Sequence, residues 1–175
     1  MERLRLGFIG KDWQRKGLLY LLKIAENLEL RSVPVEIIAV GPRRDESPSH
    51  PLLKTIGFID KDNKTKEFID IVKKFHFGCL FSKAETFGIS NLECLRLGVP
   101  VLTNSIGGIK EGVPQGLGYV FNPDAPIKEI GDLLEYYFKN PIEYAALRKR
   151  VLENTGVFSW NNAVNKFIEL WQKNK

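Results

Sequence analysis

The chain of 175 residues is long enough to build one hydrophobic core and too short for two ordinary domains with independent cores. Its hydrophobic fraction of 43% and charged fraction of 27% argue against the disordered, collagen-like and coiled-coil classes. The formal net charge of +5 favours anionic partners, but charge alone does not distinguish a nucleic acid, an anionic membrane and a phosphorylated small molecule. We therefore predict a single globular domain over residues 1–175.

Neither a membrane span nor a signal peptide is predicted. The longest apolar stretch, residues 17–25, is interrupted by Lys23 and is much shorter than the roughly 20 residues that a spanning helix needs. Charged residues near the N-terminus do not fit the apolar segment of a signal peptide. Cys79 and Cys94 lie inside apolar runs, as buried free thiols do in reducing compartments. These features predict a cytoplasmic protein.

Short apolar runs alternate along the chain with longer segments of helical periodicity. In chain order we predict a strand over residues 3–10, a helix over 17–30, strands over 35–41 and 54–60, a helix over 64–75, a strand over 77–82, a helix over 89–97, strands over 100–104 and 118–122, and helices over 127–139, 142–154 and 161–173. Such alternation is typical of an α/β fold with a doubly wound, Rossmann-like parallel sheet. Ligands of these sheets bind at the carboxyl ends of the strands, so the loops there are candidate sites.

The loop after the first predicted strand, residues 10–17, is rich in glycine and positive charge. It contains Lys11, Arg15 and Lys16 between two glycines and leads into a helix. Glycines allow the backbone to approach a ligand, and cations near a helix N-terminus attract phosphate. The loop has neither the Walker spacing nor the G-x-G-x-x-G dinucleotide fingerprint. A solvated basic loop therefore stays an alternative to a phosphate site.

Two glutamates with seven residues between them follow the fourth predicted strand. Glu85 lies in the loop and Glu93 on the next helix, and eight helical steps would separate them by about 12 Å. Carboxylates so far apart suit hydrogen bonds to two separate hydroxyl-bearing groups better than an acid/base pair. Gly88 opens the helix, whose first N–H groups at Ile89, Ser90 and Asn91 form a natural anion site. The alternative is an acidic helix start with one structural glutamate.

These loops together resemble a known family, the GT-B-fold retaining glycosyltransferases of family 4 (group 1), in their C-terminal, donor-binding domain. The resemblance covers nearly the whole chain and rests on the glycine-lysine pairs in residues 10–17, the E-x7-E stretch with its Gly-x-Pro-Val continuation in residues 85–101, and the Gly-Gly-x-x-Glu turn in residues 107–111. Lys11 replaces the usual arginine and so lacks the bidentate fork. Lys110 stands where the family often has proline.

The resemblance assigns the charged residues to parts of a nucleotide-sugar donor. It implies that Lys16 and Lys11, beside Gly10, bind the diphosphate and stabilise the charge that develops on the leaving group. Glu85 would hold hydroxyls of the transferred sugar, and Glu93 would accept hydrogen bonds from the ribose. Lys16 and Glu85 are thus the implied catalytic residues.

Uncharged residues complete this implied site. The backbone of Phe87 and Gly88 would lie beside the sugar, and the helix start at residues 89–91 would cap the phosphates. Phe58 and Ile59 would touch the nucleobase, largely through their backbone. The resemblance implies no metal ion and no cofactor besides the donor substrate.

The implied reaction is transfer of a hexose from a UDP- or GDP-linked donor to a carbohydrate or lipid-linked acceptor, with retention at the anomeric carbon, as in polysaccharide biosynthesis. In the family an N-terminal domain binds the acceptor, and this chain has room for one domain only. We therefore expect a fragment of a parent protein that binds the nucleotide sugar and is inactive alone. The parent is expected in the cytoplasm or on the inner face of the membrane. The last helix, with Trp160 and Trp171, is expected to close the domain.

Other interpretations of the sequence stay open. A non-catalytic Rossmann-like module that binds nucleotide or nucleic acid would also use a net charge of +5, although a diphosphate suits the position of the lysines better than nucleic acid. A sugar-nucleotide epimerase would need the absent dinucleotide fingerprint. His50 is predicted to be solvated, and His76 to have a packing or hydrogen-bonding role. Cys94 is expected to pack against Gly98.

Overall fold

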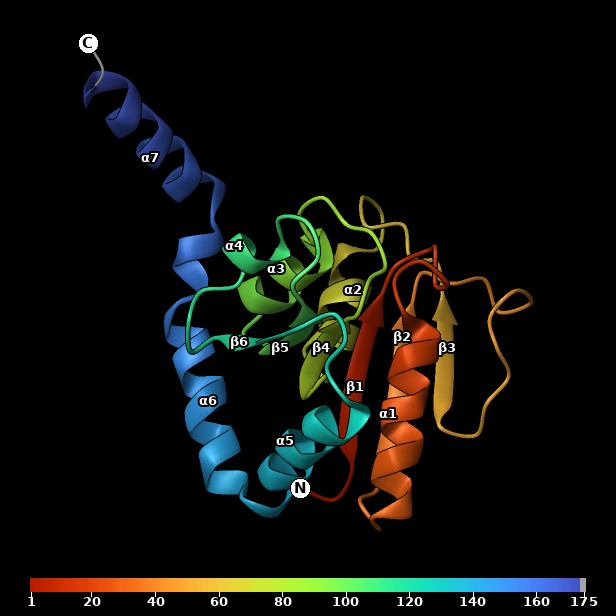
Figure 1. The fold of residues 1–175 in the computed structure, drawn as a ribbon. Helices are drawn as coiled ribbons and strands as arrows, with labels where there is room; N and C mark the ends of the chain where they lie inside the picture. The colour runs from red at the N-terminus through yellow and green to blue at the C-terminus, as the bar shows by residue number, and fades with distance from the viewer. Residues whose placement is uncertain (174–175) are drawn as a thin grey trace.

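Six parallel strands form the central sheet of the computed structural model, which describes residues 1–173 (Figure 1). Their order across the sheet is β3-β2-β1-β4-β5-β6. The strands are β1 (Leu4–Ile9), β2 (Val35–Val40), β3 (Leu53–Gly57), β4 (Phe77–Leu80), β5 (Val101–Asn104) and β6 (Gly118–Phe121). The winding reverses between the neighbours β1 and β4, as in a doubly wound sheet. The predicted α/β fold is confirmed.

Helices cover both faces of the sheet. Helices α1 and α5 pack against each other on one face, and α2 and α3 lie on the opposite face (Figure 1). The helices are α1 (Leu18–Leu30), α2 (Thr65–Val72), α3 (Ile89–Arg96), α4 (Ile109–Gly112), α5 (Ile127–Lys139), α6 (Pro141–Glu153), the 3-10 helix η1 (Thr155–Phe158) and α7 (Trp160–Lys173). The apolar stripe of α1 is buried, because residues spaced by three or four positions share one face of a helix.

The core lies between the sheet and the two helical layers. All four residues of β4 and of β5 are buried, which explains their continuously apolar sequences. Cys94 is buried as predicted, but its Sγ lies 2.4 Å from the position of a Cβ on Gly78. Gly98 faces Leu152 instead, so the expected packing of Cys94 against Gly98 is wrong. The thiol of α3 fills the space that a strand glycine leaves.

The observed elements differ from the prediction in several places, among them β3, which ends at Gly57 instead of residue 60. Helices α4 and η1 were not predicted, and α2 ends at Val72, three residues before the predicted end. Helix α7 projects away from the sheet and has no buried residue among those described (Figure 1). Trp160 and Trp171 are 86% and 60% exposed. The expectation that the last helix closes the domain is therefore wrong for residues 160–173. No helix in residues 1–173 has the length and apolar character of a membrane span.

Candidate functional site

Two loops at the switch point of the sheet are joined to each other. The loop after β1 ends at Gly17, whose φ of 80° is a left-handed conformation that favours glycine. A Cβ at Gly17 would lie 2.0 Å from the carbonyl oxygen of Phe81, at the end of β4. The Lys83 N–H donates a hydrogen bond of 2.8 Å to the Arg15 carbonyl. This close approach brings the basic loop of residues 10–17 beside the loop that carries Glu85.

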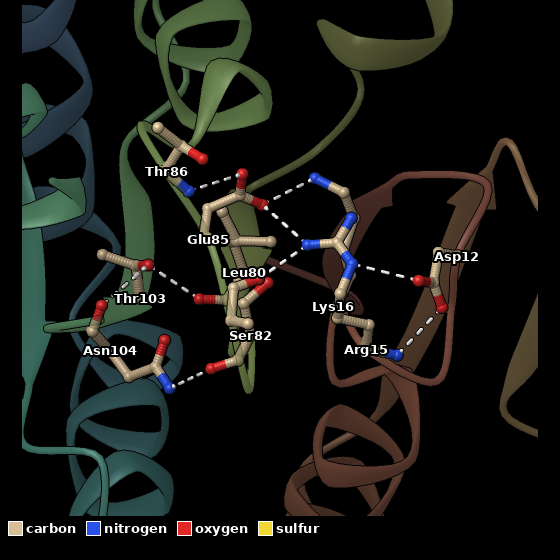
Figure 2. Close-up of polar contacts among 10 residues, drawn as sticks. Asp12, Arg15, Lys16, Leu80, Ser82, Glu85, Thr86, Thr103 and Asn104 are labelled. Carbon is tan, nitrogen blue, oxygen red and sulfur yellow. Dashed lines mark hydrogen bonds and ion pairs between the residues drawn. The ribbon is translucent and has the colours of Figure 1, made fainter. Parts of the chain in front are cut away.

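Lys16 and Glu85 form an ion pair between these loops. The Lys16 Nζ lies 3.0 Å from Glu85 Oε2, and the two side chains are only 16% and 14% exposed. Arg15 Nη1 lies 3.6 Å from the same oxygen, and the Thr86 N–H donates to Oε1 at 3.3 Å. Figure 2 shows both cations reaching the carboxylate from the β1 loop. The structure thus brings together the two residues predicted as catalytic.

The Glu85 carboxyl group is an anion at neutral pH. Partial burial acts to raise its pKa, but the hydrogen bond and charge of Lys16, the Thr86 N–H and the charge of Arg15 together hold the pKa below its ordinary value. A carboxylate with a lowered pKa accepts hydrogen bonds and does not serve as a general acid. Glu85 therefore suits the holding of hydroxyl groups.

Arg15 organises the basic loop from within. Its Nε donates to Asp12 Oδ2 at 3.0 Å, its backbone N–H donates to Asp12 Oδ1 at 3.1 Å, and its Nη1 donates to the Ala84 carbonyl at 2.6 Å. The pKa of Asp12 is lowered, and the hydrogen bond from the backbone N–H of Arg15 makes the largest contribution to this shift. Arg15 donates three hydrogen bonds within the protein, whereas Lys16 donates one from its ammonium group, so Lys16 keeps more donors for a ligand.

Glu93 is paired with a lysine that the sequence analysis did not single out. Lys61, in the loop after β3, donates a hydrogen bond through Nζ to Glu93 Oε1. The Lys61 Nζ also lies 4.3 Å from the centre of the Phe68 ring. The only signal in the sequence was its place, two residues after the predicted nucleobase contact Ile59. Each glutamate of the E-x7-E stretch therefore has a lysine partner from a different strand-end loop.

Helix α3 begins between the two glutamates and presents polar groups without partners. Gly88, its N-cap, has a φ of 71°, which favours glycine. Ser90 and Asn91 are buried, and within residues 1–173 the Ser90 Oγ and Asn91 Nδ2 have no hydrogen-bond partner. The Asn91 N–H, predicted as part of the anion site, instead donates to the Gly88 carbonyl at 2.9 Å. The N–H groups of Ile89 and Ser90 stay at the start of the helix, where N–H groups lack intrahelical partners and carry partial positive charge. This helix start is therefore able to bind an anion.

The predicted nucleobase residues lie at the side of the site near β3. Lys11 Nζ lies 4.0 Å from the centre of the Phe58 ring, a cation–π contact that links the loops after β1 and β3. The Phe58 side chain is 60% exposed, whereas Ile59 is 4% exposed and belongs to the core. Ile59 can therefore contact a ligand only through its backbone. Phe87 and Ile89 are exposed beside the start of α3.

Three glycines lie in close contact with residues of this site. A Cβ at Gly107, which has a φ of 59°, would lie 1.8 Å from the Glu85 carbonyl oxygen. The Gly108 N–H donates to the Thr86 carbonyl at 2.9 Å. A Cβ at Gly10 would lie 2.2 Å from Lys16 Cδ. The Gly107–Gly108 turn thus packs against the backbone of the Glu85 loop. Gly10 leaves space for the Lys16 side chain.

The surroundings of the charged residues include a hollow beside the β1 loop. Among residues 1–173, no group of three or more histidine, cysteine or carboxylate side chains is placed to hold a metal ion. A hollow of about 500 Å³ adjoins the site at the carboxyl ends of β4 and β5. Ser82 and Asn104 are part of its lining, and Lys16, Glu85 and Glu93 are not. The charged candidates instead lie on the loops after β1, β3 and β4 and on helix α3.

Known proteins share this chain's sequence pattern and fold. A family model described as glycosyl transferases group 1 matches residues 2–155. The chain is 22% identical over 180 residues to a D-inositol 3-phosphate glycosyltransferase of Corynebacterium urealyticum, a match that covers 95% of this chain and 42% of that protein. It is 22% identical to a glycogen synthase of Photobacterium profundum, covering 94% of this chain and 35% of that protein. The chain thus spans less than half the length of these relatives.

Solved structures of similar fold include those of TarM and of a sucrose-phosphate synthase. The structure of TarM matches with a TM-score of 0.74 at 17% identity, covering 97% of this chain and 35% of that one. Sucrose-phosphate synthase from Thermosynechococcus elongatus matches with a TM-score of 0.73 at 17% identity, covering 98% of this chain and 45% of that one. At such identities these likenesses concern the fold. With the family match over residues 2–155, they confirm the predicted resemblance: the chain belongs to the group 1 glycosyltransferases.

Proposed function

We propose that this chain binds the nucleotide-sugar donor of a retaining glycosyltransferase and supplies the groups that stabilise the leaving nucleoside diphosphate. The observation that carries the proposal is the pairing of Lys16 with Glu85 beside the start of α3. Cation, carboxylate and helix N-terminus lie together at the carboxyl ends of the strands, where α/β sheets bind ligands. The parent reaction is hexose transfer to a carbohydrate or lipid-linked acceptor, which another domain of the parent protein binds.

The diphosphate is the part of the donor that best fits the basic loop. Lys16 and Lys11 supply positive charge, and the first N–H groups of α3 with Asn91 Nδ2 supply uncharged donors. When the bond between the sugar and the diphosphate breaks, negative charge develops on the phosphate oxygen. Fixed positive groups stabilise this charge without reorganisation, so this chain's contribution to the rate is electrostatic. In this proposal no metal ion is needed.

The two glutamates hold the two sugars of the donor. Glu85 is ionised and half-buried, so it accepts hydrogen bonds from hydroxyls of the transferred hexose. Glu93 lies one helix turn farther from the loop and accepts from the ribose. Phe58 and the Ile59 backbone border the nucleobase, for which uracil and guanine are the candidates. Retention at the anomeric carbon follows if the acceptor attacks from the face that the diphosphate leaves.

Calorimetric titration with UDP, GDP and ADP tests this proposal, with duplex DNA as a competing ligand class. We expect saturable binding of one nucleotide, weakened about tenfold or more by Lys16→Met, because a hydrogen bond between charged groups contributes about 1.5–3 kcal/mol. Lys149→Met is the matched control, since Lys149 is an exposed lysine of α6 that lies 3.8 Å from Glu153. Salt-sensitive DNA binding that Lys16→Met leaves unchanged would instead identify a nucleic-acid module.

A further inference from the structure

Lys61 makes two side-chain contacts, although its side chain is 45% exposed. Its Nζ donates to Glu93 Oε1 and lies over the ring of Phe68, which is 5% exposed and belongs to the core. A lysine whose side chain makes no other contact loses much conformational entropy when it forms a single ion pair. Two contacts from two different helices, α2 and α3, reduce this cost because they favour the same position of the ammonium group. The position of Lys61 is therefore a built feature of the loop after β3.

The backbone of this loop is also fixed, by Asp60. The Asn63 Nδ2 donates to Asp60 Oδ2 at 2.6 Å, the Asp62 N–H donates to Asp60 Oδ1 at 3.1 Å, and the Lys64 N–H donates to the Asp60 carbonyl at 2.8 Å. The pKa of Asp60 is lowered, and the hydrogen bond from Asn63 makes the largest contribution to this shift. A turn held by its own first side chain presents the next residue, Lys61, in one direction.

We propose that Lys61 is a positioning residue for the ribose: it fixes the Glu93 carboxylate so that the enzyme prefers ribonucleotides over 2′-deoxyribonucleotides. This inference rests on the proposed function, in which Glu93 accepts hydrogen bonds from the ribose. Lys61 acts through Glu93 and does not need to touch the ligand. The specificity of the nucleotide site would then depend on a residue of the third strand-end loop.

The hydrogen-bond capacity of the carboxylate allows Lys61 to position Glu93 without blocking it. An ionised carboxylate has about four acceptor positions on its two oxygens, and the ammonium of Lys61 uses one of them on Oε1. Among the described residues, no hydrogen bond to Glu93 Oε2 is formed. Two ribose hydroxyls therefore still find acceptors while Lys61 stays in place.

The positive charge of Lys61 also favours its pairing with Glu93 when an anion is bound. A bound nucleoside diphosphate brings negative charge into the site, and an unpaired Glu93 would repel it. The Lys61 ammonium offsets the charge of Glu93, as Lys16 offsets that of Glu85. Without Lys61, the Glu93 side chain is free to rotate away from the anion toward solvent, because it is 23% exposed. The ribose hydroxyls would then lose their oriented acceptor.

The test is calorimetric titration of the chain with the nucleotide that it binds and with the 2′-deoxy form of that nucleotide. We expect the wild type to prefer the ribonucleotide roughly tenfold, the effect of a hydrogen bond to a charged group. Lys61→Met should reduce this preference to less than about threefold, mainly by weakening the ribonucleotide. Lys61→Arg should restore it, because a guanidinium also pairs with a carboxylate.

The controls separate this inference from the proposed function. Lys64→Met removes a charge from the same loop, where Lys64 lies 3.7 Å from Glu67, and should leave the preference unchanged. Equal weakening of both nucleotides by Lys61→Met would overturn the inference alone, since Lys61 would then act as a general charge. Tighter binding by that variant would also overturn it, since Lys61 would then compete with the ribose. A wild type that binds neither nucleotide overturns the proposed function and this inference together.

Discussion

The two ends of the parallel sheet differ in how far their polar groups are hydrogen-bonded. At the amino end, the Nδ1 atom of His76 accepts the Arg5 N–H at 2.8 Å, and the His76 carbonyl accepts the Tyr144 hydroxyl at 3.0 Å. Arg148 donates to the carbonyls of Phe75 and Lys73 at 2.6 and 3.0 Å. These bonds satisfy the end of α2 and the approach to β4, where helix carbonyls would otherwise lack partners.

At the carboxyl end, several buried polar groups have no hydrogen-bond partner among the described residues. Among residues 1–173, five buried side-chain atoms lack a hydrogen-bond partner, and those of Ser82, Ser90, Asn91 and Asn104 lie at this end. An unsatisfied buried polar group costs about 1–3 kcal/mol, so such groups are rare where a sequence is shaped only by stability. This difference agrees with the proposed function, in which the hydrogen bonds of the amino end stabilise the fold and the ligand binds at the carboxyl end.

The largest expected effect comes from breaking the support of the carboxyl end at Gly107. In Gly107→Ala the new methyl group meets the Glu85 carbonyl, and the residue must adopt a φ of 59°. Steric overlap and backbone strain together should lower the free energy of unfolding by about 2–4 kcal/mol and move Glu85 away from Lys16. We expect nucleotide affinity to fall more than about tenfold, measured by calorimetry beside urea unfolding. Gly156→Ala is the control, because a Cβ at Gly156 meets nothing within 4 Å.

A similar loss of stability without loss of binding is expected at the amino end. Arg148→Met removes the donors to two carbonyl oxygens and should lower the free energy of unfolding by about 2–3 kcal/mol. Nucleotide affinity, measured well below the unfolding temperature, should change less than about twofold. A variant that keeps its stability but loses nucleotide binding would contradict the division between the two ends.

The sheet and most helices were predictable because their signals are local. Continuous apolar runs indicated the buried strands, and the stripe of α1 specified its core face. Helix α4 spans only Ile109–Gly112, which is too short to show a helical period. The spacing of α7 predicted a helix correctly, but an amphipathic pattern does not specify the surface on which the helix packs. The expected closure by α7 failed for this reason.

The site was predictable only where residues belong to a recognisable motif. The resemblance placed Lys16 and Glu85 in one site, and the structure joins them although 69 positions separate them in the chain. Lys61 was missed because its importance depends on the loop after β3 reaching α3, a tertiary contact that spacing does not encode. The same holds for Arg15, whose partners Asp12 and Ala84 only the folded loops bring together.

The pH dependence of stability should distinguish the amino end from the carboxyl end. Burial, aided by the charges of Arg5 and Arg148, lowers the pKa of His76 from 6.5 to about 4. Between these values the unfolded chain binds a proton that the folded chain does not, so stability decreases as pH falls from 6.5 to about 4. One such proton limits the slope to about 1.4 kcal/mol per pH unit.

Unfolding by urea across this range checks the slope. His76→Asn, whose Oδ1 lies where Nδ1 does and keeps an acceptor for the Arg5 N–H, does not titrate and should flatten the decrease between pH 6.5 and about 4. The Glu85 ion pair should lose its contribution only near and below pH 4.5, the ordinary value from which its carboxyl pKa is lowered, so the slope above that pH tests His76 without it. An unchanged slope in His76→Asn would assign the decrease to other groups.

The smallest expected effect concerns the contact between Lys11 and Phe58 at the edge of the site. A double-mutant cycle of Lys11→Met and Phe58→Leu should give a coupling of about 0.5–1 kcal/mol in the free energy of unfolding, the size of an exposed cation–π contact. In the proposed site both partners also face the nucleotide, Lys11 through the diphosphate and Phe58 through the base. A saturating nucleotide should therefore reduce the coupling, because Lys11 turns from the ring to the phosphates. If the nucleotide leaves the coupling unchanged, the contact between Lys11 and Phe58 stabilises the fold, as the bonds of the amino end do, and takes no part in nucleotide binding.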